Sequence, residues 1–201
     1  MDVIQRIEKD GETYDMVKPS FCYEASYRAY IAELGNEERY PFVLDLDASD
    51  FSAYLARVDE FERGVKLPAG YVESTTFWLT HNEALIGVAN LRHRLNEEIK
   101  HIGGHIGLGI RPSFRGKGLS VLLLSLVLSE AKKRSVGEPC YAPNADSNAK
   151  PIGDAQHIHV HCYDDNEASK AMIRAVDGVL HSYTHTHSGA ERQIARFIVV
   201  Q

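Results

Sequence analysis

Residues 104–119 constrain the fold of this chain more than any other stretch. They read Gly-His-Ile-Gly-Leu-Gly-Ile-Arg-Pro-Ser-Phe-Arg-Gly-Lys-Gly-Leu, and an apolar run continues to Leu128. This pattern predicts a strand, a glycine turn and the start of a helix. Gly116 and Gly118 allow unusual backbone angles and lack the Cβ atoms that would block a ligand. The first N–H groups of a helix have no partners within it and lie at the positive end of its dipole, so the stretch predicts a phosphate or pyrophosphate site.

Two common phosphate-binding motifs do not fit this stretch. A Walker A loop needs Ser or Thr directly after its lysine, to reach magnesium. Here Lys117 is followed by Gly118. A dinucleotide-binding fingerprint would need a glycine where Pro112 stands. The phosphate of the ligand is therefore expected to bind to a loop of a different kind.

The spacing of Arg115, Gly118 and Ser120 after an apolar strand resembles the acyl-CoA pyrophosphate loop of the GNAT N-acetyltransferases. That family has Arg or Gln, two residues, Gly, one residue, and then Gly or Ala, so Ser120 is a small departure. Asn166, after the run 158–162, is similar to the asparagine that opens a helix beside the pantetheine arm in this family. Asn is also a good helix N-cap, with Ser169 at the third helical position.

Further segments carry the resemblance along most of the chain. Residues 74–79, 86–96 and 103–107 are similar to a bacterial subgroup of predicted acetyltransferases, and the similarity runs from about residue 16 to 185. The resemblance implies the GNAT fold. This is an α+β, or mixed α/β, arrangement in which helices flank a central, mostly antiparallel sheet. One pair of parallel strands in that sheet splays apart and admits the pantetheine.

The order of elements read from the chain agrees with that fold, as one domain over residues 1–201. Residues 1–15 are an edge strand or a loose arm, Ser20 is expected to cap the first helix, and Gly35 to end it. The expected helices are 20–34, 49–63, 119–134 and 167–176. The expected strands are 16–18, 75–80, 84–91, 102–110, 157–162, 179–187 and 192–200, with 102–110 and 157–162 as the splayed pair and a turn through 188–189 in the last hairpin.

Residues 135–156 form a long inserted loop in this reading. They carry three prolines and two glycines and show no clear periodicity. Loops of this length inside compact domains are usually functional or disordered. Three roles stay open, namely a lid over the acyl site, an oligomer contact and a neutral insertion.

The implied function is transfer of an acetyl group from acetyl-CoA, a co-substrate, to a primary amine of a small molecule in a ternary complex. A protein N-terminus or lysine is the less favoured acceptor. The alternative is an acyl-CoA-binding sensor or interaction module of the same fold with little turnover. The residues expected to bind the cofactor are Leu108, Gly109, Ile110, Arg115, Gly116, Lys117, Gly118, Leu119, Ser120, Asn166 and Ser169.

The proton-transfer groups are less defined. His105, His93 and Glu98 flank the expected acceptor side and are the candidate general bases. Each has a plainer reading as a structural histidine or a solvated glutamate, and a chain of water molecules could replace all three. Many relatives place a Tyr seven residues after the helix-opening Asn, where this chain has Ile173. Tyr163 and Tyr141 would replace it if the geometry allows.

Three histidines alternate in the strand 157–162, so His157, His159 and His161 project from one face. They could bind zinc or nickel, but their spacing specifies no tetrahedral set, so a polar sheet face or substrate wall is favoured and no metal is assigned. Cys162 is read as a buried, inert thiol rather than a nucleophile.

Composition narrows the class of partner. The formal net charge of −6 disfavours nucleic acid, for which a basic stripe would be expected, and leaves room for an amine substrate. The longest apolar run is too short to span a bilayer, so no membrane partner is expected. Three cysteines without a paired spacing and no signal peptide favour a cytoplasmic protein with free thiols. The resemblance also suggests a homodimer.

Overall fold

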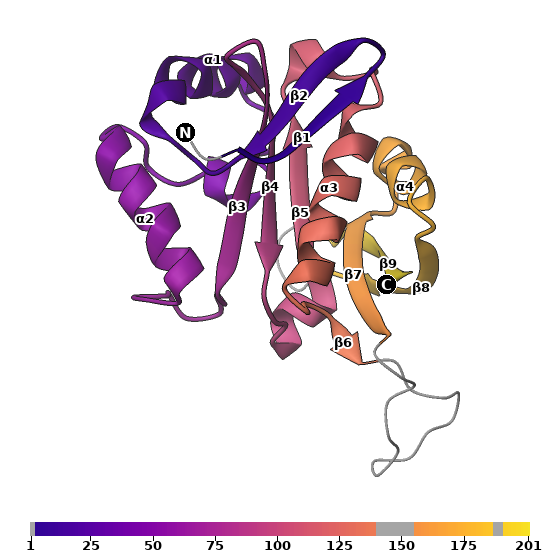
Figure 1. The fold of residues 1–201 in the computed structure, drawn as a ribbon. Coiled ribbons are helices and arrows are strands. Elements are labelled where there is room, and N and C mark those ends of the chain that lie inside the picture. Colours follow the sequence, from indigo (N-terminus) through magenta and orange to yellow (C-terminus); the bar gives the residue numbers. More distant parts are fainter. Residues whose placement is uncertain (1–2, 140–154, 187–190) are drawn as a thin grey trace.

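The computed structural model describes residues 3–139, 155–186 and 191–201. Within them, nine strands form one sheet in the order β1-β2-β3-β4-β5-β7-β9-β8, with β6 paired to β7 off this path (Figure 1). The strands are β1 (Val3–Lys9), β2 (Glu12–Val17), β3 (Ser74–His81), β4 (Ala84–Arg92), β5 (Ile106–Ile110), β6 (Glu138–Pro139), β7 (Gln156–Tyr163), β8 (Val179–His185) and β9 (Gln193–Val200). The helices are α1 (Glu24–Leu34), α2 (Phe51–Arg63), α3 (Leu119–Lys133) and α4 (Glu167–Arg174).

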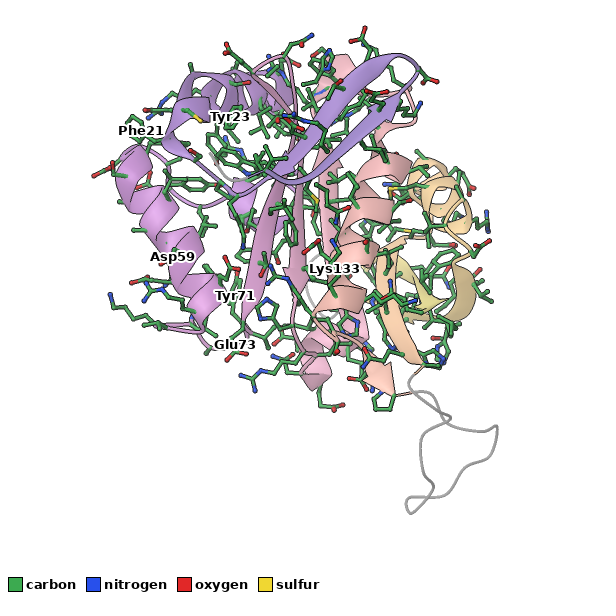
Figure 2. The ribbon with its side chains drawn as sticks, in the orientation of Figure 1. Phe21, Tyr23, Asp59, Tyr71, Glu73 and Lys133 are labelled. Carbon is green, nitrogen blue, oxygen red and sulfur yellow. The ribbon has the colours of Figure 1, made fainter. Side chains whose placement is uncertain are left out.

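Helices cover both faces of the sheet, each over its own apolar core. Side chains of α3 and α4 pack on one face with Phe77 and Leu79, and α1 and α2 pack on the other face with Trp78. Successive residues of β3 therefore enter opposite cores, as the two-residue period of a strand requires. The α1–α2 core is aromatic, and Tyr23 enters it at the start of α1 (Figure 2).

The sheet is mixed, and its one parallel pair confirms the expected fold. Every strand pairing among the described residues is antiparallel except that of β5 with β7. Within the described residues, β5 and β7 pair at a single position, Ile106 with Val160. Beyond that pair towards their carboxyl ends the strands separate, which is the predicted splay.

The start of the first helix was predicted wrongly. A 3₁₀ turn at Phe21–Tyr23 precedes α1, and the Ser20 side chain makes no capping hydrogen bond. Ser20 Oγ lies 3.3 Å from Cys22 Sγ instead. Gly35 ends α1 with a φ of 54°, as predicted.

The expected strand 102–110 is shorter than predicted. Residues Ile99–Gly103 form a π-helical turn, and β5 begins at Ile106. Tertiary contacts hold this turn, because Arg92 Nη1 donates to the carbonyl oxygens of Gly103 and Gly104 at 3.1 and 2.8 Å. The apolar Ile102 fits a strand pattern, so the sequence alone did not show the turn.

The two ends of the chain pair with the body of the sheet. Residues 3–9 and 12–17 form an edge hairpin, so of the two alternatives for residues 1–15 the edge strand is confirmed and the loose arm is wrong. Within the expected loop 135–156, β6 pairs with the start of β7. Residues 140–154 and the turn 188–189 lie outside the described residues. No helix in the described parts of the chain is long and apolar enough to cross a membrane.

Candidate functional site

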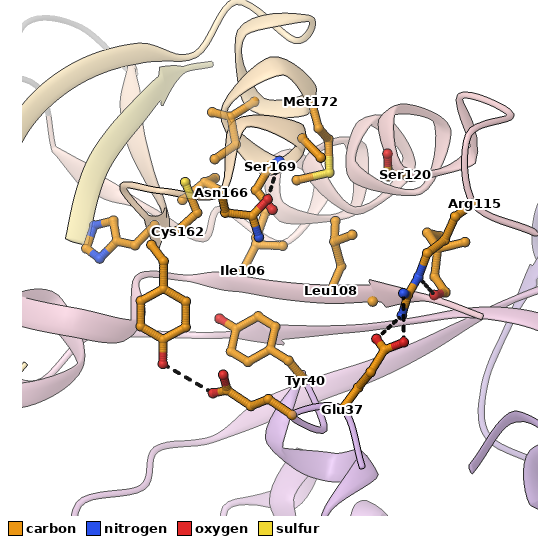
Figure 3. Close-up of a pocket in the computed structure, with 18 of the residues that line it drawn as sticks. Glu37, Tyr40, Ile106, Leu108, Arg115, Ser120, Cys162, Asn166, Ser169 and Met172 are labelled. Carbon is orange, nitrogen blue, oxygen red and sulfur yellow. Dashed lines mark hydrogen bonds and ion pairs between the residues drawn. The ribbon is translucent and has the colours of Figure 1, made fainter. Parts of the chain in front are cut away.

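A cavity of about 1040 Å³ lies where β5 and β7 separate. Figure 3 shows Ile106 and Leu108 of β5 at its centre, with Asn166, Ser169 and Met172 on one side and Glu37 and Tyr40 on the other. Of the expected cofactor-binding residues, Lys117 does not line it. The ones that do are Leu108, Gly109, Ile110, Arg115, Gly116, Gly118, Leu119, Ser120, Asn166 and Ser169.

The glycine turn ends the cavity at the N-terminus of α3. Gly116 and Gly118 have φ values of 75° and 68°, in the left-handed region that favours glycine. No side chain caps α3, so its first N–H groups are left for a ligand. Lys9 lies beside this turn, since a Cβ on Gly118 would be 3.7 Å from Lys9 Nζ. Lys117 Nζ instead lies 5.1 Å from the centroid of the Phe114 ring.

The Arg115 side chain has an internal role at the edge of the cavity. Its Nε donates to the Ile110 carbonyl oxygen at 3.0 Å, and its Nη2 donates to Glu37 at 2.7 Å. The hydrogen bond from Arg115 lowers the pKa of the Glu37 carboxyl. Arg115 therefore holds the segment after α1 against the end of β5. Because its side chain is engaged in these contacts, a ligand at this position would meet the backbone of residue 115.

The hydrogen bonding of β5 leaves alternate peptide groups directed at the cavity. Arg92 N donates to His105 O at 2.8 Å and Arg111 N donates to Ile86 O at 2.9 Å. Odd-numbered residues of β5 therefore pair with β4, because peptide groups alternate in direction along a strand. Leu108 and Ile110 direct theirs to the opposite side, where β7 has separated.

The other face of β5 is closed by the segment after α1. A Cβ on Gly107 would lie 2.9 Å from the Tyr40 hydroxyl, and one on Gly109 would clash with the Tyr40 carbonyl oxygen. The buried Tyr30 hydroxyl, which has no hydrogen-bond partner among the described residues, would be 3.3 Å from the same Gly109 atom. The two glycines thus let Tyr40 lie directly on the strand.

The start of α4 borders the cavity opposite β5. Asn166 Oδ1 accepts a hydrogen bond from Ser169 N at 2.9 Å, which is the predicted N-cap. Ile173 is fully buried in the cavity wall, where the resemblance places a tyrosine. Tyr141 lies outside the described residues. Tyr163 does line the cavity, but its hydroxyl donates to Glu38 Oε1 at 3.2 Å.

The three candidate bases do not line the cavity formed by the described residues. His105 Nδ1 accepts from His159 N at 3.0 Å, and burial lowers the pKa of His105 to about 3. His93 Nε2 is 2.8 Å from Thr75 Oγ1, and burial lowers its pKa too. Glu98 is exposed beside Gly70.

His161 lines the cavity although it was not among the predicted site residues. Its Nδ1 is 3.1 Å from the Ile102 carbonyl oxygen. Strand alternation placed its side chain beside those of His157 and His159, but the sequence did not show which of the three reaches a cavity. Cys162 also lines the cavity, and burial raises its pKa to about 11, so its thiol stays protonated. No group of three or more His, Cys, Asp or Glu among the described residues is arranged to hold a metal ion.

A second cavity of about 580 Å³ adjoins the first beneath the segment after α1. Glu37, Glu38 and Tyr40 line both. Asp45 and Tyr71 belong to the second alone. Carboxylates and aromatic rings thus surround the approach to β5 from this face.

The Acetyltransferase (GNAT) family model matches residues 36–152. Solved structures with a similar fold include the Salmonella typhimurium acetyltransferase that modifies the N-terminal serine of ribosomal protein L7/L12 (13% identity, 94% of this chain and 95% of that chain, TM-score 0.62). Mycobacterium smegmatis RimJ, in complex with CoA-disulfide, is 11% identical over 99% of this chain and 87% of that chain, with a TM-score of 0.69. The microcin C7 self-immunity acetyltransferase MccE, in complex with acetyl-CoA and AMP, is 13% identical over 96% and 94%, with a TM-score of 0.63. No curated protein sequence matches the chain.

Proposed function

The chain belongs to the GNAT family of acetyltransferases, and from this premise we propose that it transfers an acetyl group from acetyl-CoA to a primary amine of a small molecule. The observation that carries the proposal is the cavity between β5 and β7. It joins an uncapped helix N-terminus to the Leu108 and Ile110 peptide groups of β5, which face away from β4 and have no strand beside them among the described residues. A long thiol ester with a pyrophosphate at one end matches that shape and chemistry.

We expect the pyrophosphate and the pantetheine arm of acetyl-CoA to meet different parts of the cavity. The turn through Gly116 and Gly118, with the first N–H groups of α3, suits the pyrophosphate. The ammonium of Lys9 lies beside this turn, where it is paired with Asp10. The Leu108 carbonyl oxygen and the Ile110 N–H suit the amides of the pantetheine arm, which would take the place of a missing strand. Asn166 and Ser169 border the same path from α4.

The acyl transfer then needs polarisation of the thioester carbonyl. A peptide N–H on the free edge of β5 can donate to the oxyanion that forms as the amine attacks. The Leu108 N–H is suited to this role, because the strand separation leaves it without a strand partner within the described residues. The new C–N bond forms, and the C–S bond breaks to release CoA.

Closure of the acceptor side favours a small amine over a protein N-terminus. Tyr40 lies on β5, and the hydrogen bond from Tyr163 to Glu38 joins the segment after α1 to β7 across the cavity. Arg192 strengthens this bridge, with its guanidinium 3.4 Å from the Tyr163 ring centroid. Glu38 also pairs with Arg192 at 4.0 Å, which holds the same bridge.

Calorimetry with acetyl-CoA and with CoA, followed by an amine screen, tests the proposal. The variant Gly118→Trp should lose binding, because the indole fills the turn. The control Gly70→Trp puts the same residue at a glycine of positive φ that lines neither cavity and meets only the end of the Glu98 side chain, and it should bind normally. Acetylation of small amines but not of N-terminal peptides is the expected result. Faster acetylation of peptides would favour a protein acceptor, and tight binding without turnover of any amine would favour the acyl-CoA-binding module.

A further inference from the structure

One buried nitrogen beside the cavity has no partner. His161 Nε2 is shielded from solvent and makes no hydrogen bond with the described residues. Buried polar atoms are almost always hydrogen-bonded, so an exception needs an explanation. The ring lines the cavity between β5 and β7, so a small shift of the atoms that cover Nε2 would let a ligand in that cavity supply the missing partner.

The other ring nitrogen fixes the tautomer of His161. A carbonyl oxygen can only accept, so Nδ1 must donate its proton to Ile102 O across 3.1 Å. Nε2 of the neutral ring then carries a lone pair and is an acceptor. The ligand atom that meets it must therefore bear a hydrogen, as an amine nitrogen does.

The position of His161 along the cavity is that of the reacting atoms in the proposed function. The pyrophosphate end lies beyond Ile110, and β5 and β7 rejoin at Ile106 and Val160. A strand rise of about 3.3 Å per residue places Ile106 about 13 Å from Ile110, which an extended pantetheine arm can span. His161 follows Val160 directly and lies on the same face of β7 as Tyr163, towards the acceptor approach.

We propose that His161 relays a proton from the attacking amine to the departing sulfur of CoA, which deepens and rests on the proposed function above. The amine enters as the free base and donates an N–H hydrogen bond to Nε2. Its lone pair forms the C–N bond, and the N–H bond breaks as the proton moves to Nε2. The C–S bond then breaks, the sulfur keeps the electron pair, and the same proton passes from Nε2 to the thiolate. The products are the amide and CoA thiol, with His161 neutral again.

The surroundings of His161 keep its imidazole neutral before the amine attacks. Burial lowers its pKa to about 3, so the ring is neutral and the Nε2 lone pair is free when the amine arrives. Because the imidazolium is a stronger acid than a thiol, whose pKa is near 8.5, it gives the proton to the departing thiolate readily. The titratable and charged groups that influence His161 are His159 on its own strand, His105 before β5, Arg92 on β4 and Arg196 on β9.

A proton relay through His161 also explains why the enzyme can carry Ile173 where the resemblance expects a tyrosine. The resemblance expects a tyrosine there as the group that protonates the thiolate, and the fully buried isoleucine has no proton to give. A histidine that both takes and returns the proton makes a separate acid unnecessary.

Kinetics of His161→Gln test the relay. Glutamine can still accept a hydrogen bond but cannot carry the proton. The control His157→Gln changes a histidine on the same strand and face that does not line the cavity. We expect kcat of His161→Gln to fall about 100-fold or more, with the acetyl-CoA dissociation constant unchanged and the control near wild type. An unchanged kcat would overturn the relay while leaving the acetyltransferase function standing.

Chemical rescue separates proton transfer from packing. Added imidazole should restore turnover to His161→Ala, and the restored rate should follow the neutral form of the imidazole. The wild-type pH profile should rise with ionisation of the acceptor ammonium and show no histidine inflection between about pH 6 and 8. Failure of rescue in a folded variant that still binds acetyl-CoA contradicts the relay. A wild type that binds acetyl-CoA but acetylates no amine refutes the proposed function and the relay with it.

Discussion

Gly109 shows how a single missing side chain shapes the site. The Tyr40 carbonyl oxygen occupies the space where a Cβ would lie. Tyr40 belongs to the segment that closes the acceptor side, and this segment is also held by the pair of Arg115 with Glu37. A change at Gly109 therefore acts on the acceptor side as well as on stability.

The variant Gly109→Ala is expected to lower the free energy of unfolding by about 1–3 kcal/mol, because the added methyl group pushes against backbone. The control Gly103→Ala meets side-chain atoms of Arg92 and Ile99 at 3.4 Å, so its stability should change by less than about 0.5 kcal/mol. Urea unfolding of both proteins measures the difference. Equal stability of the two variants would show that Tyr40 does not lie on β5.

The N-cap of α4 is a testable feature at the scale of one element. Asn166 binds Ser169 N, whereas Ser20, the predicted cap of α1, makes no such bond. Asn166→Ala should cost about 1 kcal/mol and weaken acetyl-CoA binding, since the short α4 borders the cavity. Ser20→Ala should leave both quantities nearly unchanged. Thermal melts and calorimetry of the two variants provide the comparison.

Three histidines with lowered pKa values, His159 and His161 on β7 and His105 just before β5, predict that the fold loses stability in acid. Burial lowers the pKa of His105 and His161 to about 3 and of His159 to about 4, from an ordinary value of 6.5. Below pH 6.5 the unfolded chain takes up protons that the folded chain does not. The free energy of unfolding should therefore fall as the pH drops from about 6.5 towards 4.

Denaturant midpoints between pH 7.5 and 5 measure this effect. The variant His105→Asn can keep an acceptor for His159 N but removes one titrating group, so its stability should depend less steeply on pH. A wild-type midpoint that stays constant over this range would contradict the depressed pKa values.

Local patterns predicted the elements that depend on local chemistry. The expected strands 75–80 and 84–91 and the expected helix 49–63 match β3, β4 and α2 to within two residues at each end. The π-helical turn at Ile99–Gly103 depends instead on Arg92, which is distant in sequence, and the pattern of Ile102 matched a strand. The start of β5 was therefore predicted wrongly because a side chain outside the turn holds it, whereas the wrong start of α1 comes from a local 3₁₀ turn.

The candidate site divides in the same way. The glycine turn and Asn166 were predicted from a few consecutive residues each, and both line the cavity. His161 and Tyr40 reach the cavity through strand separation and a loop crossing, which no local pattern encodes. His105 shares the face of His161, yet hydrogen bonding to β7 turns it into a structural residue.

At the scale of the whole molecule, acetyl-CoA should stabilise the fold by binding across the gap in the sheet. At a ligand concentration of 100 times Kd, the free energy of unfolding should rise by about 2.7 kcal/mol. Hydrogen exchange should slow at Leu108 and Ile110 more than at residues of β3. Melts and exchange with and without CoA test this, and Gly118→Trp should show neither change.

The single register pair between Ile106 and Val160 has a consequence for the life of the protein. Strands β1 to β5 and strands β7 to β9 meet at β5 and β7, which are only partly paired. In the proposed complex, acetyl-CoA supplies the hydrogen bonds that another strand would otherwise provide. The cellular concentration of acetyl-CoA then governs how often the two parts of the sheet separate, and so how quickly a protease can degrade the enzyme that consumes it.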